Sequence, residues 1–151
     1  MALVYRDVPE VPTMNFAKWV RDGLGRPRVA VYLKVVAVLM LLGALSHLGS
    51  ILSLTGTSWS ARPLRFQVGD LVLLPVDLVV AWGLWRTRFW AVVGWVAGVL
   101  LLQVIPILLF SEFFATSPRE RTMLYGLLAT HAVSLGVFFL LLPGREGSRP
   151  Q

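Results

Sequence analysis

Four long apolar runs alternate with short polar segments along the chain. They cover residues 29–54, 67–85, 89–110 and 122–142, and Arg, Ser and Pro are frequent between them. Each run is close to the roughly 20 residues that carry an α-helix across the hydrocarbon core of a bilayer. The pattern therefore predicts four transmembrane helices at about 29–54, 67–85, 89–110 and 118–142, the last beginning at a polar start signal before its apolar run.

The predicted fold is all-α: an integral membrane four-helix bundle with up-down-up-down topology. Residues 29–142 form the membrane domain in this interpretation. Residues 1–28 form a cytoplasmic leader, and residues 143–151 form a cytoplasmic tail that we expect to be disordered because Pro and Gly stop the fourth helix.

The leader contains a short amphipathic pattern. Phe16, Trp19, Val20 and Leu24 recur at helical spacing, and charged residues occupy the other faces. This pattern predicts an interfacial helix that lies on the cytoplasmic surface of the membrane. Anchoring of the orientation is the simpler role for such a helix, and docking of a partner is the alternative.

The composition agrees with a membrane protein. Hydrophobic residues make up 56% of the 151 residues, and the mean hydropathy of +0.72 is too high for a soluble domain with a polar surface. The segments outside the helices are short, so any chemistry must take place in or beside the membrane. The chain has no cysteine, which excludes thiolate metal sites, iron–sulfur clusters and paired-thiol redox centres. Phosphate loops and nucleophile elbows are also absent from the sequence, so a soluble-enzyme mechanism has no support.

The formal net charge of +6 is unevenly distributed. If the N-terminus is cytoplasmic, the basic residues on that side are Arg6, Lys18, Arg21, Arg26, Arg28, Lys34, Arg86, Arg88, Arg145 and Arg149. Those on the other side are Arg62, Arg65, Arg119 and Arg121. This excess follows the positive-inside rule, so we expect a multi-pass protein of the cell membrane with both termini in the cytoplasm. The lipid bilayer thus accounts for the charge, and nucleic acid is not expected as a partner.

Local signals define the turns and bends between these helices. Only residues 86–88 separate the second and third spans, which predicts a tight antiparallel hairpin. Ser117 and Glu120, with Pro between them, match a capping box at the start of the fourth helix. Pro75 and Pro106 each remove one helical hydrogen bond, so we expect both to bend their helices.

Small residues recur at every third or fourth position in three of the predicted helices. In lipid, such rows let helix backbones approach closely and gain dispersion contacts. We expect these positions to pack helices within one chain or between chains: Gly43, Ser46, Ser50, Gly94, Gly98, Gly126, Thr130 and Ser134.

A few ionisable or amide side chains lie within the apolar runs, and they form the candidate site. They are His47, Asp70, Asp77, Gln103 and His131. At 1.5 Å per residue, His47 and Gln103 lie roughly 10 Å, and Asp77 and His131 roughly 15 Å, below the outer surface, with Asp70 near that surface. An ionisable group in hydrocarbon costs several kcal/mol unless it is neutral, paired or facing a wet interior, so these groups should point inward.

This polar layer is compatible with several chemistries. A His facing an Asp can relay protons or, with the second His, hold a metal, and two imidazoles can ligate haem iron. A His and a Gln can also hydrogen-bond a quinone carbonyl. The simplest alternative is structural: Asp77 and a His satisfy each other and fix the helix register. The residues alone assign no bound cofactor and no metal, and haem is disfavoured by the depth difference between His47 and His131.

Two stretches carry a family resemblance. The segment from Lys34 to Leu48, KVVAVLMLLGALSHL, resembles the opening span of DoxX-like proteins, which are small four-helix bacterial membrane proteins. That span often has a basic residue, an apolar stretch and a small-residue turn before a polar position. The segment from Gly83 to Ala91, GLWRTRFWA, is similar to the hairpin of many small membrane proteins of this kind. The resemblance implies an association with membrane redox systems and carries no catalytic residue over to this chain.

Three functions follow from these observations as alternatives. The first is a non-enzymatic accessory or assembly subunit, which would dock other membrane subunits or a second copy through its small-residue faces. The second is a DoxX-like component of redox or proton-coupled chemistry, with a quinone-like or small-ligand site in the outer half of the bundle. The third is a small oligomeric transporter, because four helices alone enclose little pathway.

Overall fold

The computed structural model describes residues 16–54, 56, 58–115 and 117–142. All regular structure within these residues is helical. The elements in chain order are α1 (Phe16–Leu24), α2 (Pro27–Ile51), the 3-10 turn η1 (Trp59–Ala61), α3 (Leu64–Trp85), α4 (Phe89–Gly98), the π-helix η2 (Val99–Val104), α5 (Ile105–Phe114) and α6 (Pro118–Leu141). The predicted tail at 143–151 lies outside the described residues, as does the leader before Phe16.

Four helical segments in this part of the chain are long and apolar enough to cross a membrane. They are Pro27–Ile51, Leu64–Trp85, Phe89–Ser111 and Pro118–Leu141. The prediction of four spans is therefore confirmed at the level of helix length and composition. The first helix ends at Ile51 rather than at Leu54, because Ser53 adopts a left-handed φ of 59° that terminates the helix.

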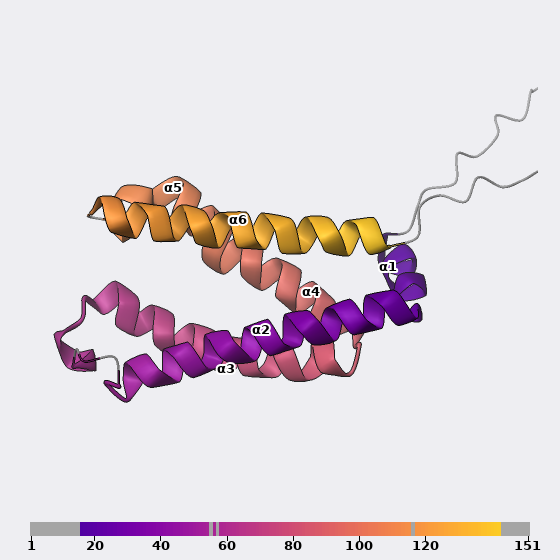
Figure 1. The fold of residues 1–151 in the computed structure, drawn as a ribbon, viewed down its shortest axis with the longest axis horizontal. Coiled ribbons are helices and arrows are strands. Elements are labelled where there is room, and N and C mark those ends of the chain that lie inside the picture. Colours follow the sequence, from indigo (N-terminus) through magenta and orange to yellow (C-terminus); the bar gives the residue numbers. More distant parts are fainter. Residues whose placement is uncertain (1–15, 55, 57, 116, 143–151) are drawn as a thin grey trace, which may run out of the picture.

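The third span runs obliquely between the other three spans. Figure 1 shows α2 and α3 side by side, α6 on the other side of the molecule, and α4, η2 and α5 crossing between them. One end of the molecule holds α1, the α3–α4 turn and the end of α6 (Figure 1), and we call it the α1 end. The opposite end holds η1, α5 and the start of α6, and we call it the η1 end.

The turn between α3 and α4 is tight because Gly83 has no side chain. A Cβ atom at Gly83 would lie 2.4 Å from Cβ of Ala91 and 2.6 Å from Cη2 of Trp90, so a larger residue would push the two helices apart. Thr87 adopts a positive φ of 51°, and the N–H of Arg88 donates to the Gly83 carbonyl at 2.9 Å. The hairpin predicted from the short polar segment is confirmed.

The third span changes its winding in the middle. Residues Val99–Val104 form a π-helix, and Pro106 follows directly. Proline has no N–H, and its ring crowds the carbonyl one turn earlier, so the backbone widens to i→i+5 hydrogen bonding at this point. The disturbance expected at Pro106 therefore takes the form of a π segment. Pro75, by contrast, lies inside the continuous helix α3.

The start of α6 has the predicted capping box. The hydroxyl of Ser117 accepts from the backbone N–H of Glu120 at 3.3 Å, and the N–H of Ser117 donates to Oε2 of Glu120 at 3.0 Å. Pro118 occupies the first turn, where its missing N–H costs nothing. This local signal was sufficient to place the helix start from sequence.

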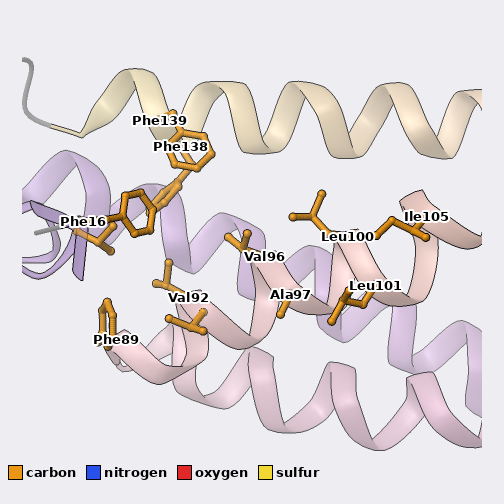
Figure 2. Close-up of a pocket in the computed structure, with 12 residues that line it drawn as sticks. Phe16, Phe89, Val92, Val96, Ala97, Leu100, Leu101, Ile105, Phe138 and Phe139 are labelled. Atoms are coloured by element: carbon orange, nitrogen blue, oxygen red, sulfur yellow. The ribbon is translucent and has the colours of Figure 1, made fainter. Parts of the chain in front are cut away.

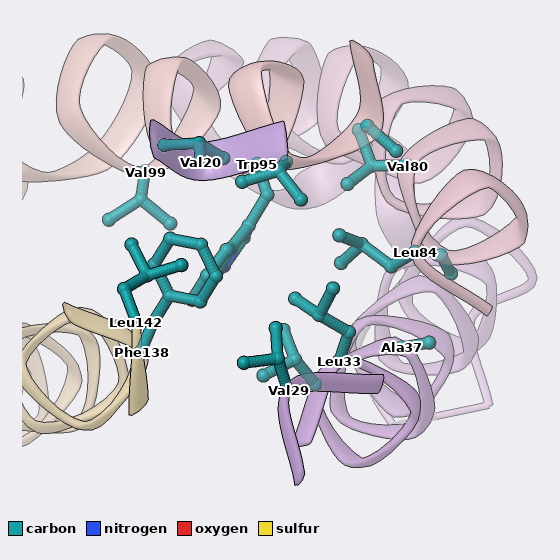
Figure 3. Close-up of a cluster of buried hydrophobic side chains, with 14 residues drawn as sticks. Val20, Val29, Leu33, Ala37, Val80, Leu84, Trp95, Val99, Phe138 and Leu142 are labelled. Atoms are coloured by element: carbon teal, nitrogen blue, oxygen red, sulfur yellow. The ribbon is translucent and has the colours of Figure 1, made fainter. Parts of the chain in front are cut away.

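The main cluster of buried apolar side chains lies toward the α1 end. Leu33 of α2, Leu84 of α3 and Phe138 of α6 are at most 1% exposed and meet in this cluster (Figure 3). Trp95 of α4 packs its ring against Phe138 in an edge-to-face contact, with ring centroids 5.6 Å apart and an interplanar angle of 81°. The core thus ties all four spans together at one end of the bundle.

Helix α1 packs against this core. Val20 is 2% exposed and belongs to the buried cluster. Trp19 stacks on Phe139 of α6, with centroids 6.4 Å apart and an interplanar angle of 7°. Residues Phe16–Leu24 are helical, and part of the apolar face of this helix is directed at the bundle; its predicted place at the membrane surface stays a prediction.

Candidate functional site

Three of the predicted polar residues meet between α2 and α3. His47 lies on α2, and Asp70 and Asp77 lie two turns apart on α3, so both carboxyl groups project from one face of that helix. Each aspartate is only 6% exposed. Because α2 and α3 run side by side, the imidazole ring of His47 comes to lie between the two carboxyl groups.

Each ring nitrogen of His47 faces one aspartate. Nδ1 lies 2.8 Å from Oδ1 of Asp70, which is a hydrogen-bond distance. Nε2 lies 3.9 Å from Oδ2 of Asp77, which is within ion-pair range and longer than a hydrogen bond. The closer partner of His47 is therefore Asp70, whereas depth within the membrane pointed to Asp77.

Arg62 completes the cluster from the loop that precedes α3. Its Nη1 donates to Oδ2 of Asp70 at 2.8 Å, so the Asp70 carboxylate is shared between a guanidinium and an imidazole. The side-chain amide of Gln67 donates to the Arg62 carbonyl at 2.7 Å and fixes the loop in this position. Since Asp70 is almost fully buried, the guanidinium and the imidazole offset the cost of removing its charge from water.

The ionic cluster, comprising His47, Arg62, Asp70 and Asp77, can be electrically neutral in two ways. One is an imidazolium at His47 with both carboxylates ionised, and the other is a neutral imidazole with a protonated Asp77. The two forms differ only in the position of one proton between groups 3.9 Å apart. The proton can therefore move between His47 and Asp77 without changing the net charge of the cluster, whereas its transfer to a bound molecule would leave the cluster with one negative charge that the protonated molecule must balance.

The absence of a side chain at Gly43 leaves space for the Asp77 carboxyl group. A Cβ atom at Gly43 would lie 2.9 Å from Oδ2 of Asp77, closer than ordinary van der Waals contact. The small residue one turn before His47 therefore makes room for a carboxyl oxygen against the backbone of α2. Gly43, one of the predicted packing positions, therefore packs against the Asp77 side chain of α3.

A cavity of about 220 Å³ adjoins the ionic cluster. His47 and Asp70 line it from one side, and Gln103 of the π-helix η2 lines it from the other. Most of the remaining lining is apolar and includes Phe66 and Pro106. Gln103 also lies beside Asp77 along a second, much smaller gap, so the structure brings His47, Asp70, Asp77 and Gln103 to one region of the η1 end.

Arg65 adds a buried donor to the cavity lining. Its Nε is buried and has no hydrogen-bond partner among the described residues, although its guanidinium stacks over Phe66 at 4.8 Å and over Phe113 at 5.3 Å. Buried donors are rarely left without an acceptor in folded proteins. A ligand oxygen in the cavity would supply one.

His131 is not brought to this cluster. Its Nδ1 bonds the carbonyl oxygen of Leu127 on its own helix at 2.7 Å, and it does not line the cavity, although Leu127 does. The two imidazoles therefore do not form a facing pair of the kind that ligates haem. Within the described part of the chain, no group of three or more His, Asp and Glu side chains is arranged to hold a metal ion.

The remaining small residues have different environments. Ser50 is 9% exposed, whereas Ser46 lies on the exposed side of α2, because α3 covers only one face of that helix. Added Cβ atoms at Gly94 and Gly98 would contact α3 at ordinary distances of 3.5 and 3.9 Å, and one at Gly126 would meet nothing within 4 Å.

The small residues Thr130 and Ser134 of α6 differ in their contacts with the rest of the bundle. The hydroxyl of Tyr32 on α2 donates to the carbonyl oxygen of Ser134, which ties this position to the bundle. Thr130 is exposed, and its hydroxyl bonds the Gly126 carbonyl of its own helix at 2.9 Å. Of the three predicted packing positions in α6, Ser134 contacts the rest of the bundle through its backbone carbonyl, whereas Gly126 and Thr130 are exposed.

Comparison with known protein families, with curated proteins and with solved structures finds no match to this chain. The geometry of the ionic cluster and its cavity is therefore the basis for the functional argument.

Proposed function

We propose that the chain is a cell-membrane protein whose four spans run up-down-up-down, with both termini and the α1 end in the cytoplasm. The uneven distribution of basic residues supports this orientation. The ionic cluster and its cavity would then lie in the outer half of the membrane. In this arrangement α1 would rest at the cytoplasmic interface beside the bundle.

The function supported best is the binding of a small, membrane-soluble molecule in the cavity at the η1 end. The observation that carries the proposal is the convergence of His47, Asp70, Gln103 and Arg65 on one largely apolar cavity of about 220 Å³. Ligand sites commonly combine an apolar enclosure with a few convergent polar groups. Ionisable residues kept within a membrane domain usually serve a function, because their burial is costly.

The lining indicates the chemical class of the ligand. The side-chain amide of Gln103 and the guanidinium of Arg65 both offer hydrogen-bond donors, while Phe66 and Leu102 offer apolar contacts. A compact ring that carries carbonyl oxygens, as in a quinone, would satisfy both kinds of contact. A proton could then pass between the ionic cluster, which reaches the cavity through His47 and Asp70, and a ligand oxygen.

A quinone-like ligand agrees with the association with membrane redox systems that the resemblance to DoxX-like proteins implies. A DoxX-like protein would be associated with membrane redox systems, and a carbonyl-bearing ligand is suited to such a setting. The proposed site would bind the ligand and exchange a proton with it, and the proposal assigns it no redox group of its own. We therefore propose a ligand-binding membrane component rather than an enzyme with its own electron carrier.

The experiment is a ligand-dependent stability measurement on the full chain in detergent. A short-chain benzoquinone should raise the melting temperature of the wild-type protein, because a ligand that binds only the folded state stabilises it by mass action. The Gln103→Leu variant keeps the side-chain size and removes one hydrogen bond. We expect its apparent affinity to fall about tenfold, which corresponds to roughly 1.4 kcal/mol.

The matched control is His131→Ala, which removes a polar side chain of the membrane domain that does not line the cavity. Its ligand response should equal that of the wild type. Equal ligand responses in the wild type, the Gln103→Leu variant and the His131→Ala variant would refute the site, and so would the absence of any response in the wild type.

A second function is favoured by the exposure of α6. Only 6% of the apolar stretch of α6 is buried, compared with 33% for α3, and added Cβ atoms at Gly126 and Gly136 would meet nothing within 4 Å. A helix of another membrane subunit could approach closely along this side. The chain would then act as an accessory subunit, with the ligand site serving the assembled complex.

Extraction in mild detergent tests this second function. The tagged wild-type protein should elute with other membrane subunits in a particle larger than one chain. Gly126→Ile should shift it to the size of the single chain, whereas Val31→Phe, which adds bulk at a 63% exposed position of α2, should leave the assembly intact. Elution of the wild type as a single chain would count against the accessory role.

A further inference from the structure

A second, wholly apolar groove runs along the opposite half of the molecule. It has a volume of about 360 Å³ and lies between α1, the α4–η2 segment and the end of α6 (Figure 2). Phe16 and Phe89 line it at the α1 end, and Leu101 and Ile105 line it at the far end (Figure 2). None of its lining residues is shared with the cavity beside the ionic cluster.

The dimensions of the groove fit a hydrocarbon chain. Phe89 and Ile105 span about 24 Å of helix at 1.5 Å per residue, which exceeds the roughly 15 Å depth of one leaflet's hydrocarbon. Apolar side chains line the groove over this whole length, which is the environment that an acyl chain requires.

The mouth of the groove lies at a strongly basic end of the molecule. The basic residues of the described chain there are Lys18, Arg21, Arg26, Arg28, Lys34, Arg86 and Arg88, and the one described acidic residue beside them is Asp22. Arg21 on α1 is exposed, and its guanidinium lies 4.7 Å from the ring centroid of Phe89. This contact holds a cation directly over a residue that lines the groove.

We propose that this groove is a binding site for an anionic phospholipid of the surrounding bilayer. One acyl chain lies along α4 and η2, beside Val96 and Ala97, and the phosphate group pairs with Arg21 at the mouth. A guanidinium can bind phosphate oxygens through two parallel hydrogen bonds, which an exposed ammonium cannot match. The bound lipid joins α1, α4 and α6, the three elements that border the groove.

The test measures which lipids stay bound to the full chain. The protein is reconstituted in vesicles of phosphatidylcholine and phosphatidylglycerol in equal amounts, extracted in mild detergent and analysed by native mass spectrometry. The wild type should retain phosphatidylglycerol in preference to phosphatidylcholine. Arg21→Gln should lower that preference about fivefold, the size expected for one basic residue near an anionic membrane surface. Ala97→Phe should fill the groove and abolish retention of both lipids.

Two matched controls distinguish a built site from general surface effects. Arg86→Gln removes another arginine that stacks on an aromatic ring at the α1 end, 4.3 Å from the Trp82 centroid and outside the groove lining. Ala132→Phe adds the same bulk to an exposed position of α6. Both variants should retain lipid as the wild type does, and if Ala97→Phe fails to fold, Ala97→Leu should show a partial loss.

Equal loss in the two arginine variants would refute the proposal, because it would indicate only general attraction to charge. Equal retention in the two phenylalanine variants would refute it as well, since the groove would then be irrelevant. A second copy of the chain bound in place of lipid would also overturn it.

Discussion

Replacement of Gly43 by alanine gives the sharpest test of the ionic cluster. The added Cβ atom would lie 2.9 Å from Oδ2 of Asp77 and 3.9 Å from its Cγ, so the carboxyl group must move by about 0.5 Å to restore ordinary contact. Glycine in the interior of a helix is also less favourable than alanine by about 1 kcal/mol. The clash and the gain in helix propensity therefore oppose each other, and the net change in stability should be close to zero.

A double-mutant cycle separates the two effects. In an Asp77→Ala background the clash is absent, so Gly43→Ala should stabilise the protein by about 1 kcal/mol. The difference between the two backgrounds gives a coupling energy of about 1 kcal/mol, typical of residues in direct contact. The free energy of unfolding is measured by titration with sodium dodecyl sulfate in mixed micelles, with helix content followed by circular dichroism.

The control is Gly136→Ala in the interior of α6, where an added Cβ meets nothing within 4 Å. It should stabilise the protein equally in both backgrounds. If Gly43→Ala also gives the same change with and without Asp77, the Asp77 carboxyl does not rest on α2, and the geometry of the ionic cluster is wrong.

Three other predictions follow from single contacts. Gly83→Ala should destabilise the protein by about 2 kcal/mol, because the turn between α3 and α4 has no room for a methyl group; an unchanged unfolding midpoint in the same titration would contradict this. Arg62→Gln should cost about 1–3 kcal/mol, because the buried Asp70 carboxylate loses a charged donor, and a midpoint within error of the wild type would mean that this ion pair does not form in the membrane. Because the chain has no native cysteine, a membrane-impermeant maleimide added to intact cells should label Ser60→Cys and leave Thr87→Cys unlabelled, and the reverse pattern would invert the proposed topology.

Local rules account for the parts of the fold that were predicted from sequence. The four spans follow from run length, because bilayer thickness sets the length of an apolar helix. The capping box at Ser117 and the hairpin after Trp85 involve residues only a few positions apart, so both can be predicted from a short stretch of sequence. The π segment before Pro106 could be anticipated only as a disturbance, since a proline determines where hydrogen bonding fails and the neighbouring packing determines how it is restored.

The candidate site was predicted less completely, for a physical reason. Depth along a helix follows from residue number, whereas rotation about the helix axis depends on packing with the neighbours. His47 and His131 lie roughly 10 and 15 Å below the outer surface by residue number, but depth does not show that only His47 faces the carboxyl groups, while His131 bonds its own helix at Leu127. Arg62 was assigned to the outer loop from its position between the first two spans, and its contact with Asp70 depends on the loop conformation held by Gln67.

The two ends of the bundle differ in how their side chains pack. The α1 end contains the apolar cluster around Leu33, Leu84 and Phe138, whose burial favours a single rigid arrangement. The η1 end contains buried charges, a π segment and a cavity, and each of these lowers the density of apolar contacts. Ligand sites tend to occupy such less densely packed regions, because a bound molecule must enter and leave without disrupting the core. The ionic cluster and its cavity thus lie together at the end with fewer buried apolar side chains, and this coincidence is the reason for proposing a ligand site there in addition to the structural role that paired charges alone would have.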